Sequence, residues 1–118
     1  MQYLGRATIR TNGEYLPSKK GAKLHLGGAK RSPVVTNFSV GYAEENDPAM
    51  VECVVPLARD LSLTSLRNLV DAVVTFECDS GQIYVVRGAF VTDCLELTDG
   101  EGGDVQLKFC GEAAEELI

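Results

Sequence analysis

Short strand-forming stretches separated by turn residues fill most of the chain, and this spacing constrains the fold more than any other feature. Residues 3–10 alternate loosely and end at Asn12-Gly13, a pair that favours tight hairpin turns. Further stretches with strand character span 34–43, 49–55, 72–78, 82–87, 89–98 and 105–110. Many short strands at close spacing are typical of small barrels and sandwiches. A chain of 118 residues has room for one domain, so we expect a single domain spanning 1–118.

The stretch 34–43 has two different faces if it is one strand. Side chains alternate across a strand, so its larger residues would share one face: Thr36, Phe38, Val40 and Tyr42. The opposite face would be small and polar, and would consist of Asn37, Ser39, Gly41 and Ala43. The acids and proline of 44–48 predict a turn before the return strand at 49–55.

One helix is expected, at about 62–71. Ser62 or Thr64 can cap its free backbone N–H groups. The apolar residues recur at helical spacing and would form one stripe that consists of Leu63, Leu66, Leu69 and Val70. Gly88 is expected to end the strand before it, and residues 112–118 to form a short helical turn or to fray. The predicted fold is therefore mainly β, a small barrel or sandwich with one flanking α-helix.

The stretch 17–33 differs in composition and predicts a flexible basic arm or extended hairpin. Between Tyr15 and Ala43 there is no acidic residue, and five basic residues give a charge of +5: Lys19, Lys20, Lys23, Lys30 and Arg31. The net charge of the whole chain is −6, so the rest of the chain carries −11. Three interpretations remain. The arm is a solvated loop, or it contacts nucleic acid, although no stacking aromatics are interleaved. Alternatively, it docks on the acidic body of a neighbouring copy, in a head-to-tail contact.

Signatures of catalysis are lacking in the sequence. His25 is the only histidine and lies in a Gly-rich stretch, so no Ser-His-acid set can be argued. The four cysteines form no CxxC pair and are expected to be reduced, buried thiols and not zinc ligands. Residues 99–104 lack the regular ligand spacing of a calcium loop. We therefore expect no enzyme, no metal and no cofactor. The polar start and the absence of a long apolar run predict synthesis in the cytoplasm without membrane insertion.

The order and wording of the segments resemble the tail tube proteins of Mu-like phages. The arm GAKLHLGGAKR is followed by VGYAEE, MVECVVP, the predicted helix LTSLRNLVDA, VTFECDSGQIYVV, GAFVTD and LKFCGEAAEE. The resemblance implies a β-barrel or sandwich whose copies close into hexameric rings, which stack into a hollow tube of the virion tail. It also implies sheath and tape-measure partners, and DNA that passes through without specific binding. It carries over no catalytic residue.

The resemblance gives two groups of residues a candidate role. The five basic residues of the arm become a candidate contact between subunits, which should weaken as salt rises if it is electrostatic. The small residues Asn37, Ser39 and Gly41 become candidates for the lumen lining. Two other classes stay open: a tail completion or adaptor protein that stops at one ring, and a cytosolic ligand-binding β-barrel with an apolar pocket.

Overall fold

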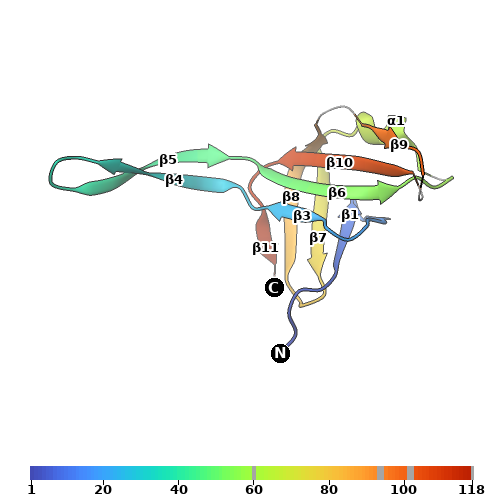
Figure 1. The fold of residues 1–118 in the computed structure, drawn as a ribbon, viewed down its shortest axis with the longest axis horizontal. Coiled ribbons are helices and arrows are strands. Elements are labelled where there is room, and N and C mark those ends of the chain that lie inside the picture. The colour runs from blue at the N-terminus through green and yellow to red at the C-terminus, as the bar shows by residue number, and fades with distance from the viewer. Residues whose placement is uncertain (60, 93–94, 101–102, 118) are drawn as a thin grey trace.

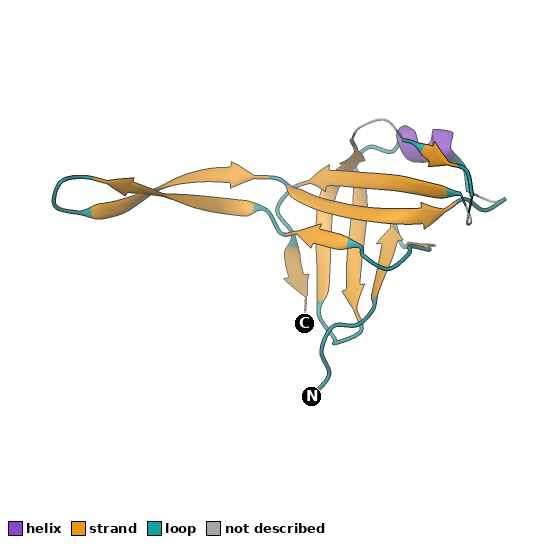
Figure 2. Cartoon of the chain, viewed as in Figure 1, coloured by secondary structure: helices purple, strands orange, loops and turns teal. Residues whose placement is uncertain are grey.

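The computed structural model describes residues 1–59, 61–92, 95–100 and 103–117, which form a β-rich body and one long projecting hairpin (Figures 1 and 2). The elements in chain order are β1 Ala7–Thr11, β2 Glu14–Leu16, β3 Lys23–His25, β4 Gly28–Val35, β5 Val40–Asp47, β6 Ala49–Pro56, α1 Leu63–Arg67, β7 Ala72–Cys78, β8 Ile83–Val91, β9 Leu97–Thr98, β10 Asp104–Gly111 and β11 Glu115–Leu117. The predicted mainly β fold with one small helix is confirmed.

The strands of the body follow one antiparallel order, β2-β1-β7-β8-β10-β6-β3, with β11 added beside β8 and β9 beside β10. Figure 1 shows β6 and β10 crossing β7 and β8 steeply, so the two halves of the sheet face each other as layers. β8 links them, because it pairs with β7 along its first part and with β10 at Phe90 and Val91. Among the described residues β2 and β3 do not pair, so a seam remains between the ends of the order.

Gly88 does not end its strand, contrary to the prediction. It has a φ of 62°, and the register of β8 against β7 shifts beside it, between Ala72 and Val74. An extra residue in one strand is a β-bulge, which bends a strand without ending it. The bulge therefore turns β8 from one layer into the other.

The core lies between the two layers and explains why several strands were predictable. Along β6 every second residue is buried, from Ala49 to Val55, while the residues between them are partly exposed. β10 buries Val105, Leu107 and Phe109 in the same alternation. The predicted strands at 49–55, 72–78 and 105–110 are therefore confirmed as β6, β7 and β10.

The helix is shorter than predicted. α1 spans only Leu63–Arg67, and Ser62 caps it by accepting a hydrogen bond from Ser65 N at 3.3 Å. Leu63, Leu66 and Leu69 pack against the core, but Val70 is 70% exposed, so its predicted place in the stripe is wrong. Asp71 has a φ of 51°, a conformation that helices do not contain, and it redirects the chain into β7.

The predicted strand at 34–43 is wrong, because a turn divides it. β4 and β5 form a hairpin that pairs Gly28 with Asp47 at its base and Val35 with Val40 near its end. Thr36 N donates to Ser39 O at 2.9 Å, and the two side-chain hydroxyls lie 2.7 Å apart. Such hydroxyl contacts offer the backbone an alternative to a strand ladder.

Three other predictions about local structure also need correction. Residues 44–47 belong to β5 and do not form a turn. The tail forms the short strand β11 on β8 and not a helical turn, with Glu115 opposite Val85. The predicted strand 89–98 is divided between the end of β8 and β9, and positions 93–94 lie outside the described residues.

The arm expected at 17–33 has different limits in the structure. β3 belongs to the body, since it pairs with β6, and the projecting element is the hairpin of residues 28–47. The junction lies at Gly27, whose φ is 70°. A Cβ there would lie 2.5 Å from Ala49 N, so only glycine allows the two chain segments to approach this closely.

Candidate assembly surfaces

The hairpin extends away from the body and gives the molecule its length, with extents of 62 × 38 × 27 Å (Figure 1). Every residue of β4 and β5 is exposed except Gly28, which is half-buried. Among the described residues its strands pair only with each other. The C-terminal segment supports the base, where Ala114 N donates to Leu26 O at 2.9 Å. A two-stranded ribbon of this kind is marginally stable on its own.

The hairpin balances much of its charge internally. Lys30 lies opposite Glu45 in the strand register, and Arg31 lies opposite Glu44. The Arg31 Nε and the Glu44 Oε1 are 3.2 Å apart, and the guanidinium also lies 5.5 Å from the centre of the Tyr42 ring. The acids that seemed remote from the basic stretch in the sequence are therefore its cross-strand neighbours.

The five predicted interface residues do not form one patch. Lys30 and Arg31 lie on the hairpin, whereas Lys23 lies on β3 of the body, opposite Glu52. Lys19 precedes β3 and forms an ion pair with Asp104, while Lys20 is exposed in the same loop. Their role in subunit contact stays a prediction.

The outer part of the hairpin is apolar and uncharged. We call residues 32–43 the tip; it contains no charged side chain. Its large residues are exposed: Val34, Val35, Phe38, Val40 and Tyr42, with Phe38 100% exposed. Soluble proteins seldom gather so many apolar side chains on one free surface without a partner. In the sequence, the signal for this surface is the absence of charged residues over 32–43.

The predicted lumen residues lie at this tip. Asn37 and Ser39 are within the turn, and Gly41 is on β5. They do not share the strand face from which the prediction was made. Their place in a lumen stays a prediction.

A second surface without charged lining residues lies beside the seam, between the N-terminal segment, β3 and the strands β7 and β8. We call it the seam groove; it has a volume of about 490 Å³ and is lined by Gln2, Tyr3, Leu4, Ala22, Leu24, Leu26, Phe76, Cys78, Ser80, Gln82 and Tyr84. None of the lining residues is an Asp, Glu, Lys, Arg or His. Tyr3, Leu4 and Leu26 are exposed although they are apolar.

Asp79 fixes the N-terminal wall of the seam groove. Its Oδ1 accepts from Gly5 N at 3.1 Å, its carbonyl accepts from Gln2 Nε2 at 3.1 Å, and its own N donates to Arg6 O at 3.0 Å. The backbone N–H groups of Gly5 and Arg6 lower the pKa of the Asp79 carboxyl, because they stabilise its charged form. The segment before β1 is therefore fastened to the turn between β7 and β8.

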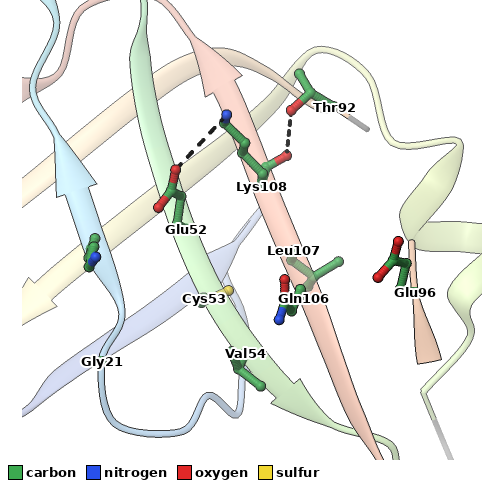
Figure 3. Close-up of a pocket in the computed structure, with 10 residues that line it drawn as sticks. Gly21, Glu52, Cys53, Val54, Thr92, Glu96, Gln106, Leu107 and Lys108 are labelled. Atoms are coloured by element: carbon green, nitrogen blue, oxygen red, sulfur yellow. Dashed lines mark hydrogen bonds and ion pairs between the residues drawn. The ribbon is translucent and has the colours of Figure 1, made fainter. Parts of the chain in front are cut away.

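The outer face of β6 and β10 is polar, and Figure 3 shows its side chains. Lys108 Nζ lies 4.0 Å from Glu52 Oε1, and the Lys108 carbonyl accepts from Thr92 N at 2.9 Å. A shallow pocket of about 460 Å³ lies on this face. Beneath it, burial raises the pKa of the Cys53 thiol to about 12, so this thiol stays protonated and is a poor nucleophile.

The other residues considered for chemistry are not brought together. His25 is exposed on β3. Within the described ranges, no three His, Cys, Asp or Glu side chains are grouped so that they could hold a metal ion. In that same part of the chain, no helix is both long and apolar enough to cross a bilayer.

Comparison with known sequences decides the family. The sequence profile of the phage tail tube proteins matches residues 1–116. The chain belongs to the phage tail tube protein family. The Mu-like prophage FluMu tail tube protein of Haemophilus influenzae is 36% identical over 107 residues, which are 91% of this chain and 89% of that protein. The tail tube protein of Escherichia phage Mu is 26% identical over 116 residues, 98% and 96% of the two chains. The resemblance to Mu-like tail tube proteins is confirmed, and the protein is a structural tail tube subunit.

Solved structures with the same fold include parts of an extracellular contractile injection system and of the anti-feeding prophage. An extracellular system, PVC, contributes its sheath/tube terminator in the extended state, with a TM-score of 0.73 and 10% identity over 96% of this chain and 94% of that one. The sheath-tube complex of the same system has a TM-score of 0.70 and 10% sequence identity, over 95% of this chain and 88% of that one. The tube-terminating cap of the anti-feeding prophage has a TM-score of 0.73 and 11% sequence identity, over 99% of this chain and 93% of that one. At such low identity these similarities concern the fold alone.

Proposed function

We propose that six copies of the tail tube subunit close into a ring, and that rings stack into a hollow conduit through which DNA passes without specific binding. A contractile sheath surrounds this tube and a tape-measure protein occupies it during assembly. The proposal is supported by family membership and by the fold shared with a subunit of a sheath-tube complex. Synthesis occurs in the bacterial cytoplasm, and we expect no catalytic activity.

The exposed tip of the hairpin is the observation that carries this proposal. Its apolar side chains, with Phe38 fully exposed, remain in water in the isolated chain. Burying a Val or Phe side chain stabilises a complex by about 1.5–3 kcal/mol. A self-assembling protein offers an abundant partner for such a surface, namely an identical copy.

The internal charge balance changes the expected character of the contact. The hairpin cations Lys30 and Arg31 face Glu45 and Glu44 of the same hairpin, which reduces their attraction for a distant acidic surface. We therefore expect assembly to depend mainly on the tip, and only weakly on ionic strength, because screening acts on charges and not on apolar contacts. The basic residues of the body, Lys19, Lys20 and Lys23, remain candidates for a secondary contact.

Negative-stain electron microscopy over a concentration series tests the proposal. The wild-type protein should form rings or tubes of uniform width. Phe38→Ser should remain monomeric, whereas Val70→Ser should assemble normally, because Val70 is 70% exposed but lies on the body. Monomers of wild-type protein at every concentration would contradict the proposal.

A second candidate is an adaptor that ends a tube at a single ring. It is favoured by the fold similarity to two tube-terminating proteins, whose TM-scores of 0.73 are slightly above the 0.70 of the sheath-tube complex. Single rings that never stack, even at high concentration, would support the adaptor over the tube.

A further inference from the structure

We infer that the seam groove of one copy receives the hairpin tip of a second copy. This inference rests on the proposed function, since it requires that copies of the chain assemble. It adds the identity of the receiving surface and the residues that meet there. Three independent features of the structure support it: the absence of charged side chains from the two surfaces, the chemistry of the seam groove and the direction of the hairpin.

The two surfaces resemble each other because neither is lined by a charged side chain, although the carboxyl groups of Asp79 and Glu116 lie at the margin of the seam groove. The chain is 24% charged, yet both the tip and the lining of the seam groove contain no Asp, Glu, Lys or Arg. Three other pockets of the described body do contain such residues. They hold Lys23 and Glu52 on the polar face, Glu14 beside α1, and Arg6, Lys19 and Lys20 near the start of β1. An apolar tip would strip water from those charges without replacing it, which costs free energy.

The seam groove also offers suitable chemistry. Its volume of about 490 Å³ is similar to that of the three charged pockets, so its lining and not its size distinguishes it. Tyr3, Phe76 and Tyr84 line it, and aromatic rings such as that of Phe38 pack favourably edge-to-face against other rings. Within the described chain β3 pairs with β6 alone, so its other edge is open at the seam. Free strand edges are common receptors for an extended segment of another chain.

The tip cannot fill the groove of its own chain. Figure 1 shows the hairpin directed away from the body, while the N-terminal segment that forms one wall of the groove lies below the body. The base is packed tightly against the start of β6, because a Cβ on Gly27 would lie within 2.5–2.7 Å of the Pro48 and Ala49 backbone. The groove that receives the tip must therefore belong to another chain, and a self-assembling subunit offers an identical copy.

Site-specific photo-crosslinking in assembled particles tests the contact between the tip and the seam groove directly. Benzoylphenylalanine replaces Phe38, and isotopically labelled and unlabelled chains are mixed so that links between copies are recognised by mass. We expect links between copies to residues 2–4, 22–26 or 76–84. The same probe at position 70 should give none of these links. Links from position 38 to α1, to the polar face of β6 and β10, or only within one chain would overturn the inference.

A charge exchange tests the same contact by its energetics. Leu26→Glu should raise the concentration needed for assembly at least tenfold, which corresponds to about 1.4 kcal/mol. Leu97→Glu is the matched control, since Leu97 is 53% exposed and Leu26 is 50% exposed. Adding Phe38→Lys to Leu26→Glu should recover part of the loss. The urea unfolding of monomeric Leu26→Glu should equal that of monomeric Phe38→Ser, which separates assembly from folding.

The outcomes distinguish this inference from the proposed function. Normal assembly of Leu26→Glu, equal loss in Leu97→Glu, or no recovery in the double variant would refute the groove as the receptor while tubes still form. Wild-type protein that never assembles would refute both.

Discussion

Gly27 provides the sharpest test of how the hairpin is joined to the body. Its φ of 70° is left-handed, and an alanine in this conformation costs about 1–2 kcal/mol. Its Cβ would also lie 2.5 Å from Ala49 N and 2.6 Å from Pro48 C, which are backbone atoms at the start of β6. Ala49 is fully buried, so relief requires the buried strand to move, at a cost of a further 1–3 kcal/mol or so. We expect Gly27→Ala to lower the free energy of unfolding by about 2–5 kcal/mol.

Gly13 is a matched control for this substitution. Its φ is 84°, but a Cβ there would meet nothing within 4 Å. Gly13→Ala should therefore lose only the conformational part, about 1–2 kcal/mol. Urea unfolding followed by circular dichroism measures both, and electron microscopy of the same samples measures assembly. Assembly should fail in Gly27→Ala, because a shift at the base displaces the tip, and persist in Gly13→Ala. Equal losses of stability in the two variants would refute the reasoning.

Three further predictions follow from buried or hydrogen-bonded groups. Phe109→Ala should destabilise the body by about 3–5 kcal/mol in urea unfolding, because Phe109 is fully buried; a loss below about 1 kcal/mol would contradict its place in the core. Cys53, with its pKa raised to about 12, should resist iodoacetamide at pH 8 until the protein is unfolded in urea, and rapid labelling of the folded protein would be evidence against burial. The folded pKa of Asp79 is below its ordinary 3.8, so its contribution to stability is present above pH 3.8 and is lost as the pH falls through the folded pKa. The NMR shift of the Gly5 amide should titrate below pH 3.8, and Asp79→Asn should abolish this titration.

The body was largely predictable because burial leaves a pattern in the sequence. The alternation of β6 and β10 reflects one buried and one partly exposed face, and both strands were expected within one residue of their bounds. The bulge at Gly88 was missed because glycine is equally compatible with a break and a bend, and only the pairing partner decides between them.

The hairpin was not predictable in the same way, because neither of its faces is buried. With no inner face to impose alternation, the apparent pattern over 34–43 carried no structural information. The turn at 36–39 depends on hydroxyl contacts of Thr36 and Ser39, and the sequence alone does not show that these contacts form. Glu44, the partner of Arg31, is 13 residues away in the sequence. Counting charges along the chain therefore placed the two side chains in different regions, although the fold brings them to 3.2 Å.

The attachment of the hairpin at its base alone has a consequence for how such tubes diverge. Substitutions in the tip leave the packing of the body untouched, since the side chains of residues 29–47 are exposed. Natural selection therefore acts on the tip through the partner and hardly at all through folding. A bacterium that carries two related prophages encodes two such subunits. Divergence confined to the tip and to the surface that receives it is enough to keep the two assemblies from mixing, without any change in the shared scaffold.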